Sequence, residues 1–205
     1  MAHAEDLSPG KREQTKLANR AAILEAAREI FGELGFETAT VRDIIRRTGL
    51  SVGAFYNYFR SKEEVFEALA ADGAMRFRPI LHEEYRKASD FESYLRGAVR
   101  AYFEFIAREN AAWRDKWPAG DPVPHTHDTP ENQAVFEEVR SALEGVMDRG
   151  LAPRVDLDYL TAACIAIARE VGVEMLVRRP VDTEAAVEFV VRLILGGVAA
   201  LPRVG

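Results

Sequence analysis

The sequence predicts an all-α protein with a small N-terminal head of three helices and a larger C-terminal helical body. Apolar residues recur three and four positions apart along almost every segment, which is the spacing of one face of an α-helix. Glycines and hydroxyl-bearing residues separate these segments where helices end and begin. Strand-like alternation and internal repeats are absent from the sequence. With 48% hydrophobic residues in 205, the chain has enough apolar mass to form a core.

The elements of the head follow from their start and stop residues. Gly35 is suited to end the first helix, and Gly49 to end the second. Thr40 with Asp43 three residues later is the pattern of a capping box, and Ser51 can cap the third helix. The predicted elements are a flexible arm over residues 1–15, helices over residues 16–34, 40–48 and 52–59, and a fourth helix that begins at residue 62.

The body is predicted to contain longer helices, two of which are mostly apolar. In residues 91–108 the charged side chains fall four apart on one narrow stripe, so most of the helix circumference belongs in an interior. The last segment has the same arrangement and more apolar surface than one chain of this size covers. The predicted body helices span residues 91–108, 130–149, 157–178 and 183–201. Thr129 caps the second of them, and the proline-rich loop PAGDPVPHTHDTP leads into it.

Charge and cysteine content narrow the class of protein. The net charge of −6 argues mildly against nucleic-acid binding, yet residues 38–62 contain five basic residues and one acidic residue, so 5 − 1 = +4. The single cysteine, Cys164, cannot form a disulfide within the chain. The N-terminus has no apolar stretch typical of a secretion signal, and the longest apolar run is about half of a membrane span. We therefore expect a soluble, cytoplasmic protein.

Residues 41–59 have the length and order of a helix-turn-helix. The segment supplies small residues for close approach to a DNA groove, side chains that hydrogen-bond to bases or phosphates, and cations at helix starts. These residues are Arg42, Gly53, Ala54, Tyr56, Asn57, Tyr58 and Lys62. Charge and periodicity alone leave an ordinary helical hairpin with a solvated basic face as an equal alternative.

The stretch TVRDIIRRTGLSVGAFYNYFRSKEEVFEAL, which begins at Thr40, resembles the DNA-binding domain of the tetracycline-repressor (TetR) family of bacterial regulators. The shared pattern includes Gly49-Leu50-Ser51, Phe55-Tyr56, Tyr58-Phe59 and Ser61-Lys62-Glu63. The resemblance implies a homodimer that binds a palindromic operator, with an inducer pocket in each C-terminal domain. It also implies that DNA is released when the pocket fills.

Position by position, the resemblance implies DNA contacts from Thr40, Arg42, Ser51, Val52, Gly53, Ala54, Tyr56, Asn57, Tyr58 and Lys62. Val52 cannot hydrogen-bond to a base edge, although it can touch a thymine methyl group, so the operator sequence stays open. The predicted domains are the arm 1–15, the DNA-binding domain 16–62 and the ligand-binding and dimerisation domain 63–205. The predicted function is a regulator, a repressor released by a small, mainly hydrophobic molecule. The alternative is a dimeric ligand-binding adaptor whose head contacts a protein instead of DNA.

The body is predicted to enclose a ligand cavity, because large side chains of residues 91–108 face the small residues of TAACIAIA, Thr161 to Ala168. Tyr102, Tyr159 and Arg169 are the candidate polar groups, and the partner of Arg169 is either Glu170 or an anionic ligand. The candidate ligand-binding residues are Tyr102, Phe103, Ile106, Trp113, Phe136, Val139, Leu143, Tyr159, Ala163, Cys164, Ile167 and Arg169.

The remaining expectations concern chemistry and assembly. Cys164 is interpreted as a packed hydrophobe rather than a redox sensor. His125 and His127 lack further ligands, so no metal or cofactor is predicted, and no catalytic or phosphate-binding motif occurs, so no enzyme is predicted. The last two helices are expected to form a four-helix bundle with a second subunit. The candidate interface residues are Phe189, Val190, Leu193, Ile194 and Gly197.

Overall fold

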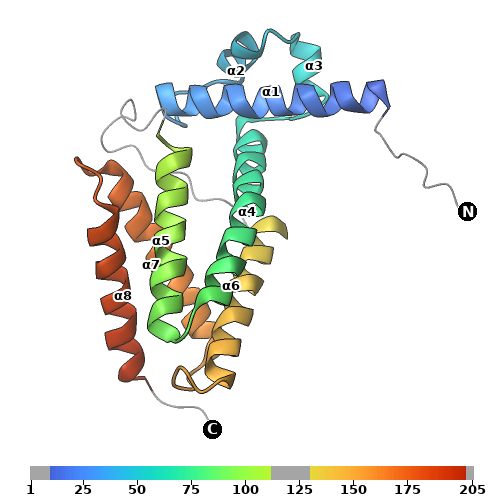
Figure 1. Cartoon of the computed structure of the whole chain (residues 1–205). Helices are drawn as coiled ribbons and strands as arrows, with labels where there is room; N and C mark the ends of the chain where they lie inside the picture. The colour runs from blue at the N-terminus through green and yellow to red at the C-terminus, as the bar shows by residue number, and fades with distance from the viewer. Residues whose placement is uncertain (1–9, 112–129, 202–205) are drawn as a thin grey trace, which may run out of the picture.

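The computed structural model of the chain describes residues 10–111 and 130–201. These ranges contain helices and no strand, which confirms the predicted fold class. Figure 1 shows α1 lying across the top with α2 and α3, while the other helices run roughly alongside one another below. The helices are α1 (Lys11–Leu34), α2 (Val41–Thr48), α3 (Val52–Tyr56), α4 (Lys62–Lys87), α5 (Phe91–Glu109), α6 (Pro130–Asp148), α7 (Leu157–Val177) and α8 (Thr183–Ala199).

Two helices of the head differ from their predicted bounds. α1 begins at Lys11 rather than at residue 16, so part of the predicted arm is helical. The residues after Gly10 are good helix formers without proline or glycine, and the hydroxyl of Thr15 donates to the carbonyl of Lys11 at 2.9 Å. α3 ends at Tyr56 rather than at residue 59, because the amide of Tyr58 donates to the carbonyl of Phe55 at 2.9 Å and tightens the chain into a turn.

The head has its own apolar core, and α1 contributes more of its buried residues than any other helix. Ile23, Ala27, Ile44 and Phe55 are fully buried there, so α2 and α3 are both fixed on α1. The same core includes Val65 from the first turn of α4 and the partly buried residues that follow it. The head therefore continues into α4 beyond residue 62, where the sequence placed its end.

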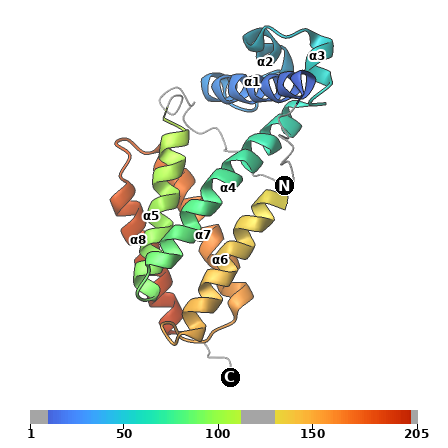
Figure 2. The same ribbon diagram turned by 45° about the vertical axis from the view of Figure 1, so that its right-hand side comes forward.

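The body is built around α5, which packs against α4, α7 and α8. Phe103 in the middle of α5 is fully buried, as the mostly apolar pattern of this segment predicted. α4 leaves the head and descends along α5 and α6, which Figure 2 shows most clearly. One continuous helix thus packs in both the head and the body.

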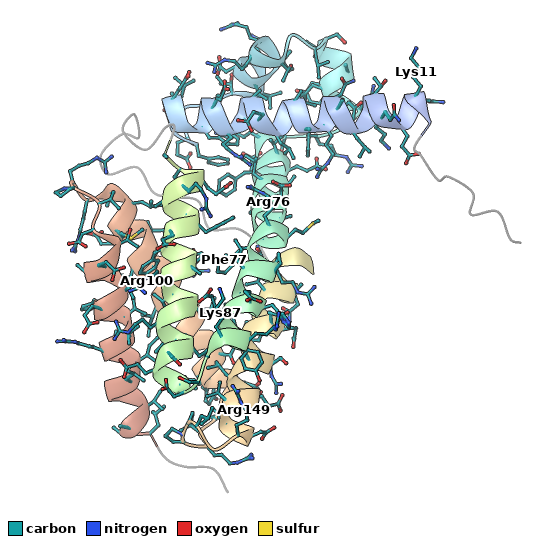
Figure 3. The ribbon with its side chains drawn as sticks, in the orientation of Figure 1. Lys11, Arg76, Phe77, Lys87, Arg100 and Arg149 are labelled. Carbon is teal, nitrogen blue, oxygen red and sulfur yellow. The ribbon has the colours of Figure 1, made fainter. Side chains whose placement is uncertain are left out.

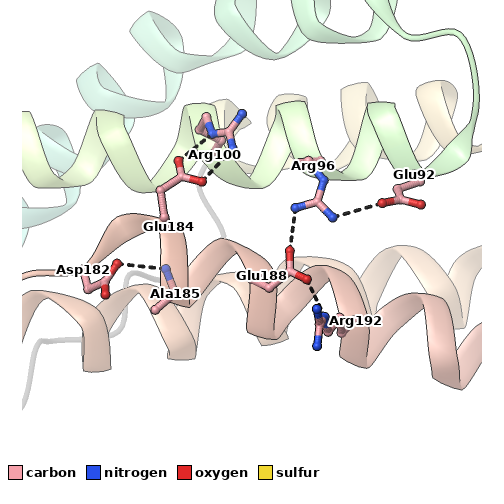
Figure 4. A network of polar contacts seen from close by, with 8 residues as sticks. All are labelled: Glu92, Arg96, Arg100, Asp182, Glu184, Ala185, Glu188 and Arg192. Atoms are coloured by element: carbon pink, nitrogen blue, oxygen red, sulfur yellow. Dashed lines mark hydrogen bonds and ion pairs between the residues drawn. The ribbon is translucent and has the colours of Figure 1, made fainter.

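The charged stripe predicted on α5 faces the charged stripe predicted on α8. Arg96 donates to Glu188 at 2.7 Å, and Arg100 holds Glu184 through two hydrogen bonds of 2.9 and 2.8 Å (Figure 4). Each such exposed pair is worth only up to about 1 kcal/mol, so apolar packing supplies most of the contact. The pairs set the register of α8 on α5.

Two sequence predictions remain, one on membrane spans and one on individual residues. Among the described residues, no helix combines the length and apolar character needed to cross a membrane. The predictions made for Trp113, His125 and His127 lie outside the described residues.

Candidate nucleic-acid interface and internal cavity

The turn between α2 and α3 has the geometry expected of a helix-turn-helix. The hydroxyl of Thr40 accepts from the amide of Asp43 at 3.3 Å, and the Asp43 carboxylate accepts from the amide of Thr40 at 3.1 Å, which completes the predicted capping box. The Thr40 hydroxyl also donates to the Asp43 carboxylate at 2.6 Å, and this bond, with the one from the Thr40 amide, lowers the pKa of Asp43. Gly49 ends α2 with a φ of 68°, a left-handed conformation that favours glycine. The amide of Ala54 donates to the hydroxyl of Ser51 at 3.2 Å, so Ser51 caps α3 as predicted.

α3 presents one side to solvent and anchors the other in the head. Phe55 is fully buried, while Val52 is 58% exposed and Tyr56 is 52% exposed. Gly53 and Asn57 are exposed as well, and a Cβ added at Gly53 would meet open space. Of the other predicted DNA contacts, Ala54 and Tyr58 are half-buried, and the Tyr58 hydroxyl accepts a hydrogen bond from Asn19 on α1 at 3.3 Å.

The basic residues near the turn are not equally available to a partner. Arg42, at the start of α2, is exposed and has no ion-pair partner among the described residues. Arg46 has an 81% exposed side chain and lies 3.7 Å from Asp43. Arg47 instead binds Glu29 and Glu33 on α1, which raises its pKa and fixes α2 on α1. The positive charge open to solvent is therefore smaller than the sequence count.

Lys62 has a different position from the one predicted. Its ammonium group donates to the carbonyls of Phe36, Glu37 and Ala39 at 2.7, 3.0 and 3.2 Å. It also lies 4.6 Å from the centre of the Phe36 ring. An ammonium group has three hydrogens, and all three are used by these carbonyls. The prediction that Lys62 grips phosphate is wrong for this structure, in which Lys62 ties the first turn of α4 to the loop between α1 and α2.

We expect Lys62→Met to lower the free energy of unfolding of the head by about 2 kcal/mol, because hydrogen bonds from a charged donor are lost. Chemical denaturation checks this, and Arg60→Met, which removes a nearby exposed cation, is the matched control. DNA titrations should give Lys62→Met the salt dependence of the unsubstituted protein. A salt slope smaller by about one unit without a loss of stability would restore the phosphate role.

A cavity of about 520 Å³ runs between α4, α5, α6 and α7. Its wall is mostly apolar, and small residues such as Ala70 and Gly73 on α4, Ala98 on α5 and Ala168 on α7 leave the space open. Figure 3 marks Phe77, whose ring lies 5.5 Å from that of Tyr102 and 5.4 Å from that of Phe105. The cavity reaches up to Arg28 and Phe31 of the head. Its size is typical of small-molecule sites.

The structure places some of the predicted ligand residues around this cavity and separates others from it. The predicted residues on its wall are Tyr102, Ile106, Phe136, Val139, Leu143, Cys164 and Arg169. Phe103 and Ile167 belong to the apolar core and do not line the cavity. The prediction is wrong for Tyr159, which is 79% exposed, and for Ala163, which is also exposed on the outer face of α7.

Four charged side chains lie together at the end of the cavity beside the head, and three of them, Arg28, Arg76 and Glu109, line it. Arg76 on α4 makes two hydrogen bonds of 2.7 Å to Glu109 on α5, and these lower the pKa of Glu109 (Figure 3 labels Arg76). Arg28 on α1 lies 3.7 Å from Glu109 and 3.8 Å from Asp72. We call Arg28, Asp72, Arg76 and Glu109 the junction cluster. It joins the head to the body through ion pairs as well as through α4.

The buried polar groups of the cavity are uncharged. Burial raises the pKa of Tyr102 and of Cys164 to about 12, so neither ionises at neutral pH, in agreement with the interpretation of Cys164 as a packed hydrophobe. Arg169 also lines the cavity. It donates to Glu170 at 3.0 Å, so of the two partners considered from the sequence, Glu170 is the one present. Tyr94, which the sequence did not single out, is buried in the wall and has a raised pKa for the same reason as Tyr102.

The predicted dimer residues divide between two faces of α8. Phe189 is 58% exposed and Leu193 is 49% exposed, and Gly197 lies on the same outer face. Val190 and Ile194 are buried in the core of their own chain, so the prediction that they face a partner is wrong. On α7 the exposed residues Tyr159, Ala162, Ala163, Ala166 and Val177 extend the outer apolar surface.

An N-terminal helix-turn-helix head on a helical body with an apolar cavity defines the class of ligand-binding DNA regulators. A sequence model of the bacterial regulatory proteins of the tetR family matches residues 23–69. The chain is 34% identical over 139 residues, 64% of its length, to the HTH-type transcriptional repressor AcnR of Corynebacterium glutamicum, covering 68% of that protein. It is 27% identical over 185 residues to the HTH-type transcriptional activator FasR of Mycolicibacterium smegmatis, covering 89% of this chain and 84% of that protein.

The fold is also found in a solved regulator. The structure of the transcriptional regulator FadR from Bacillus subtilis in complex with stearoyl-CoA has a TM-score of 0.65 at 18% identity, covering 87% of this chain and 98% of that one. The chain belongs to the TetR family of bacterial regulatory proteins, and it is a DNA-binding transcriptional regulator.

Proposed function

We propose that the protein is a cytoplasmic repressor whose homodimer leaves a palindromic operator when a mainly hydrophobic molecule enters the cavity. One observation carries the proposal: a single cavity extends from Leu143 and Cys164 in the body to Arg28 and Phe31 in the head. Its occupant would touch both parts of the molecule. The similarity to the repressor AcnR supports repression rather than activation of transcription. A regulatory rather than a catalytic role is part of this proposal.

The exposed side of the helix-turn-helix is the surface that we assign to operator recognition. Val52, Tyr56 and Asn57 are free to contact base edges, Gly53 allows the backbone to approach, and Arg42 is placed for phosphate or guanine. Thr40, Ser51, Ala54 and Tyr58 support this surface, because their hydroxyl or methyl groups are used within the head or are half-buried.

Arg42→Ala combined with Asn57→Ala should weaken operator binding by roughly tenfold or more and relax base preference, since each removes a contact worth about 1–3 kcal/mol. Fluorescence anisotropy with a duplex selected by the unsubstituted protein measures both effects. Arg149→Ala, which removes an exposed cation at the far end of the body (labelled in Figure 3), should leave binding unchanged. Equal losses in both variants would place DNA recognition elsewhere.

The wall of the cavity favours a ligand with a long apolar part. FadR from Bacillus subtilis, which shares the fold, was solved in complex with stearoyl-CoA. Fatty acyl compounds are therefore the first effectors that we propose for this chain. The arginines and the amide of Asn110 at the head end could receive a polar end group.

The junction cluster gives the ligand a route to the head. A ligand at this end of the cavity competes with Glu109 for Arg28 and Arg76, which now hold α1 and α4 on α5. Loss of these ion pairs frees the head to change its angle to the body. DNA then selects one head arrangement and the ligand selects another, which is a population shift.

The test is the DNA affinity of the protein with and without a long-chain acyl-CoA or the free fatty acid. We expect a decrease in affinity of at least about fivefold, the lower range of allosteric coupling. A short-chain acyl-CoA is the control for the nucleotide part alone. If no acyl chain length changes the affinity although the compounds bind, the ligand-responsive part of the proposal is wrong.

A further inference from the structure

A buried hydroxyl in the cavity wall has no hydrogen-bond partner. Tyr94 is 2% exposed, its side chain lines the cavity, and its hydroxyl oxygen has no partner among the described residues. Its ring packs edge-on against Tyr85 at 6.0 Å between centres, which fixes the ring but leaves the hydroxyl unused. A buried polar group without a partner destabilises a protein, so such a group in a cavity wall points to a partner supplied from outside the chain.

The position of Tyr94 defines the far end of the cavity. The cavity-lining residues of α5 form one stripe along the helix and comprise Tyr94, Leu95, Ala98, Val99, Tyr102, Phe105, Ile106 and Glu109. Tyr94 stands in the first turn of α5 and Glu109 is its last residue, so a rise of 1.5 Å per residue separates them by about 22 Å along the axis. The charged junction cluster and the Tyr94 hydroxyl therefore lie at opposite ends of a long, apolar wall.

The two ends offer different chemistry to a ligand. The junction cluster contains two arginines, which suit an anionic or strongly polar group. At the other end the groups that act electrostatically on Tyr94 are Cys164, Glu138 and Tyr85, and none of them is a cation. The cations near these groups are Arg78 and His82, which bind Glu138, and Arg149, which lies 5.2 Å from the centre of the Tyr85 ring. An anion placed there would be buried beside no unpaired cation among the described residues, because Arg78 and His82 are already bound to Glu138. A neutral oxygen that accepts one hydrogen bond suits the Tyr94 hydroxyl, which donates.

We infer that the cavity binds an elongated, mainly apolar molecule that carries a neutral, hydrogen-bond-accepting oxygen at its inner end, and that the Tyr94 hydroxyl donates to this oxygen. Hydroxyl, ketone and ester groups meet the requirement, and an unsubstituted alkyl end does not. This inference rests on the proposed ligand-responsive function and narrows the class of ligand to chains oxidised at the end remote from the charged group.

The experiment compares ω-hydroxy fatty acids with the unsubstituted fatty acids of equal chain length, by isothermal titration calorimetry on the full chain. The native protein should bind the hydroxylated member more tightly by roughly threefold to tenfold, the effect of one additional buried hydrogen bond. Tyr94→Phe removes only the hydroxyl and should abolish this preference while binding of the unsubstituted acid is kept. Tyr102→Phe, which removes another tyrosine hydroxyl from the same wall, should keep the preference.

A second measurement does not depend on any ligand. Without its partner the Tyr94 hydroxyl is a cost to the folded protein, so Tyr94→Phe should raise the melting temperature of the ligand-free chain, by roughly a few degrees. A lower melting temperature would mean that the hydroxyl already has a structural partner such as an ordered water, and would overturn the inference. Equal affinities of the native protein for the two acids would overturn it as well. A failure of DNA affinity to respond to either acid would count against the proposed function instead.

Discussion

Replacing Leu193 with aspartate is expected to convert the proposed dimer into a monomer. Phe189, Leu193 and Gly197 form an exposed stripe on α8, and Ala163 and Ala166 lie exposed on the neighbouring α7. Apolar surface of this kind marks an interface, and the small residues would let the helices of two subunits approach closely. A carboxylate at Leu193 would be buried there without a partner, a cost of several kcal/mol at each of two equivalent sites.

Multi-angle light scattering measures the outcome directly. The native protein should have twice the 22.9 kDa mass of the chain, and Leu193→Asp should have the mass of the chain with unchanged helix content. Leu151→Asp is the matched control, because Leu151 is exposed in the connection between α6 and α7 and is not part of the α8 stripe. Ile194→Asp should unfold the subunit instead, since Ile194 is buried in its own core. A native protein that remains monomeric at micromolar concentration would contradict the dimer proposal.

Replacing Ala98 with phenylalanine should abolish the response of DNA binding to ligand while DNA binding itself survives. Ala98 lies in the middle of the α5 stripe, half-buried and in the cavity wall, so a ring at this position projects into the open volume. It would occupy the space of the ligand chain at the point where the chain must pass between Tyr94 and the junction cluster. The helix-turn-helix is remote from this site and keeps its exposed side unchanged.

The size of the effect depends on whether the added ring finds empty space. Phenylalanine forced into a filled core costs about 1–3 kcal/mol, whereas phenylalanine that fills a true cavity costs little. Thermal unfolding of Ala98→Phe therefore reports on the cavity without any ligand. Ala98→Ser adds a single atom and should retain the ligand response. A response retained in Ala98→Phe would show that the effector binds elsewhere.

The head could be predicted from the sequence because its signals are local. The capping box at Thr40, the cap at Ser51 and the glycine at position 49 each act within a few residues, and the structure contains all three. Lys62 could not be placed in this way, because its acceptors are carbonyls of residues 36–39, more than twenty positions earlier. Nothing in the local sequence indicates that those carbonyls turn toward α4.

The body was harder to predict because two of its helices are apolar on several faces. The TAACIAIA run of α7 has no charge to mark its outer side, so the sequence did not show that Cys164 and Ala168 face inward while Ala163 and Ala166 face outward. The same ambiguity led the sequence analysis to group the buried Val190 and Ile194 of α8 with the exposed Phe189 and Leu193 as interface residues. The contributions of α4 and of Arg28 to the cavity depend on how the head sits on the body, which no local pattern encodes.

Selection of duplexes from a random library by the native protein tests whether the head recognises operator DNA, and the affinity is then measured across a range of salt concentrations. We predict enrichment of a palindromic site, as expected for two equivalent heads, and an affinity that falls steeply as salt rises because cations of the head release counterions from phosphates. Absence of affinity for any duplex at low salt would contradict the assignment of the head as a DNA-binding surface.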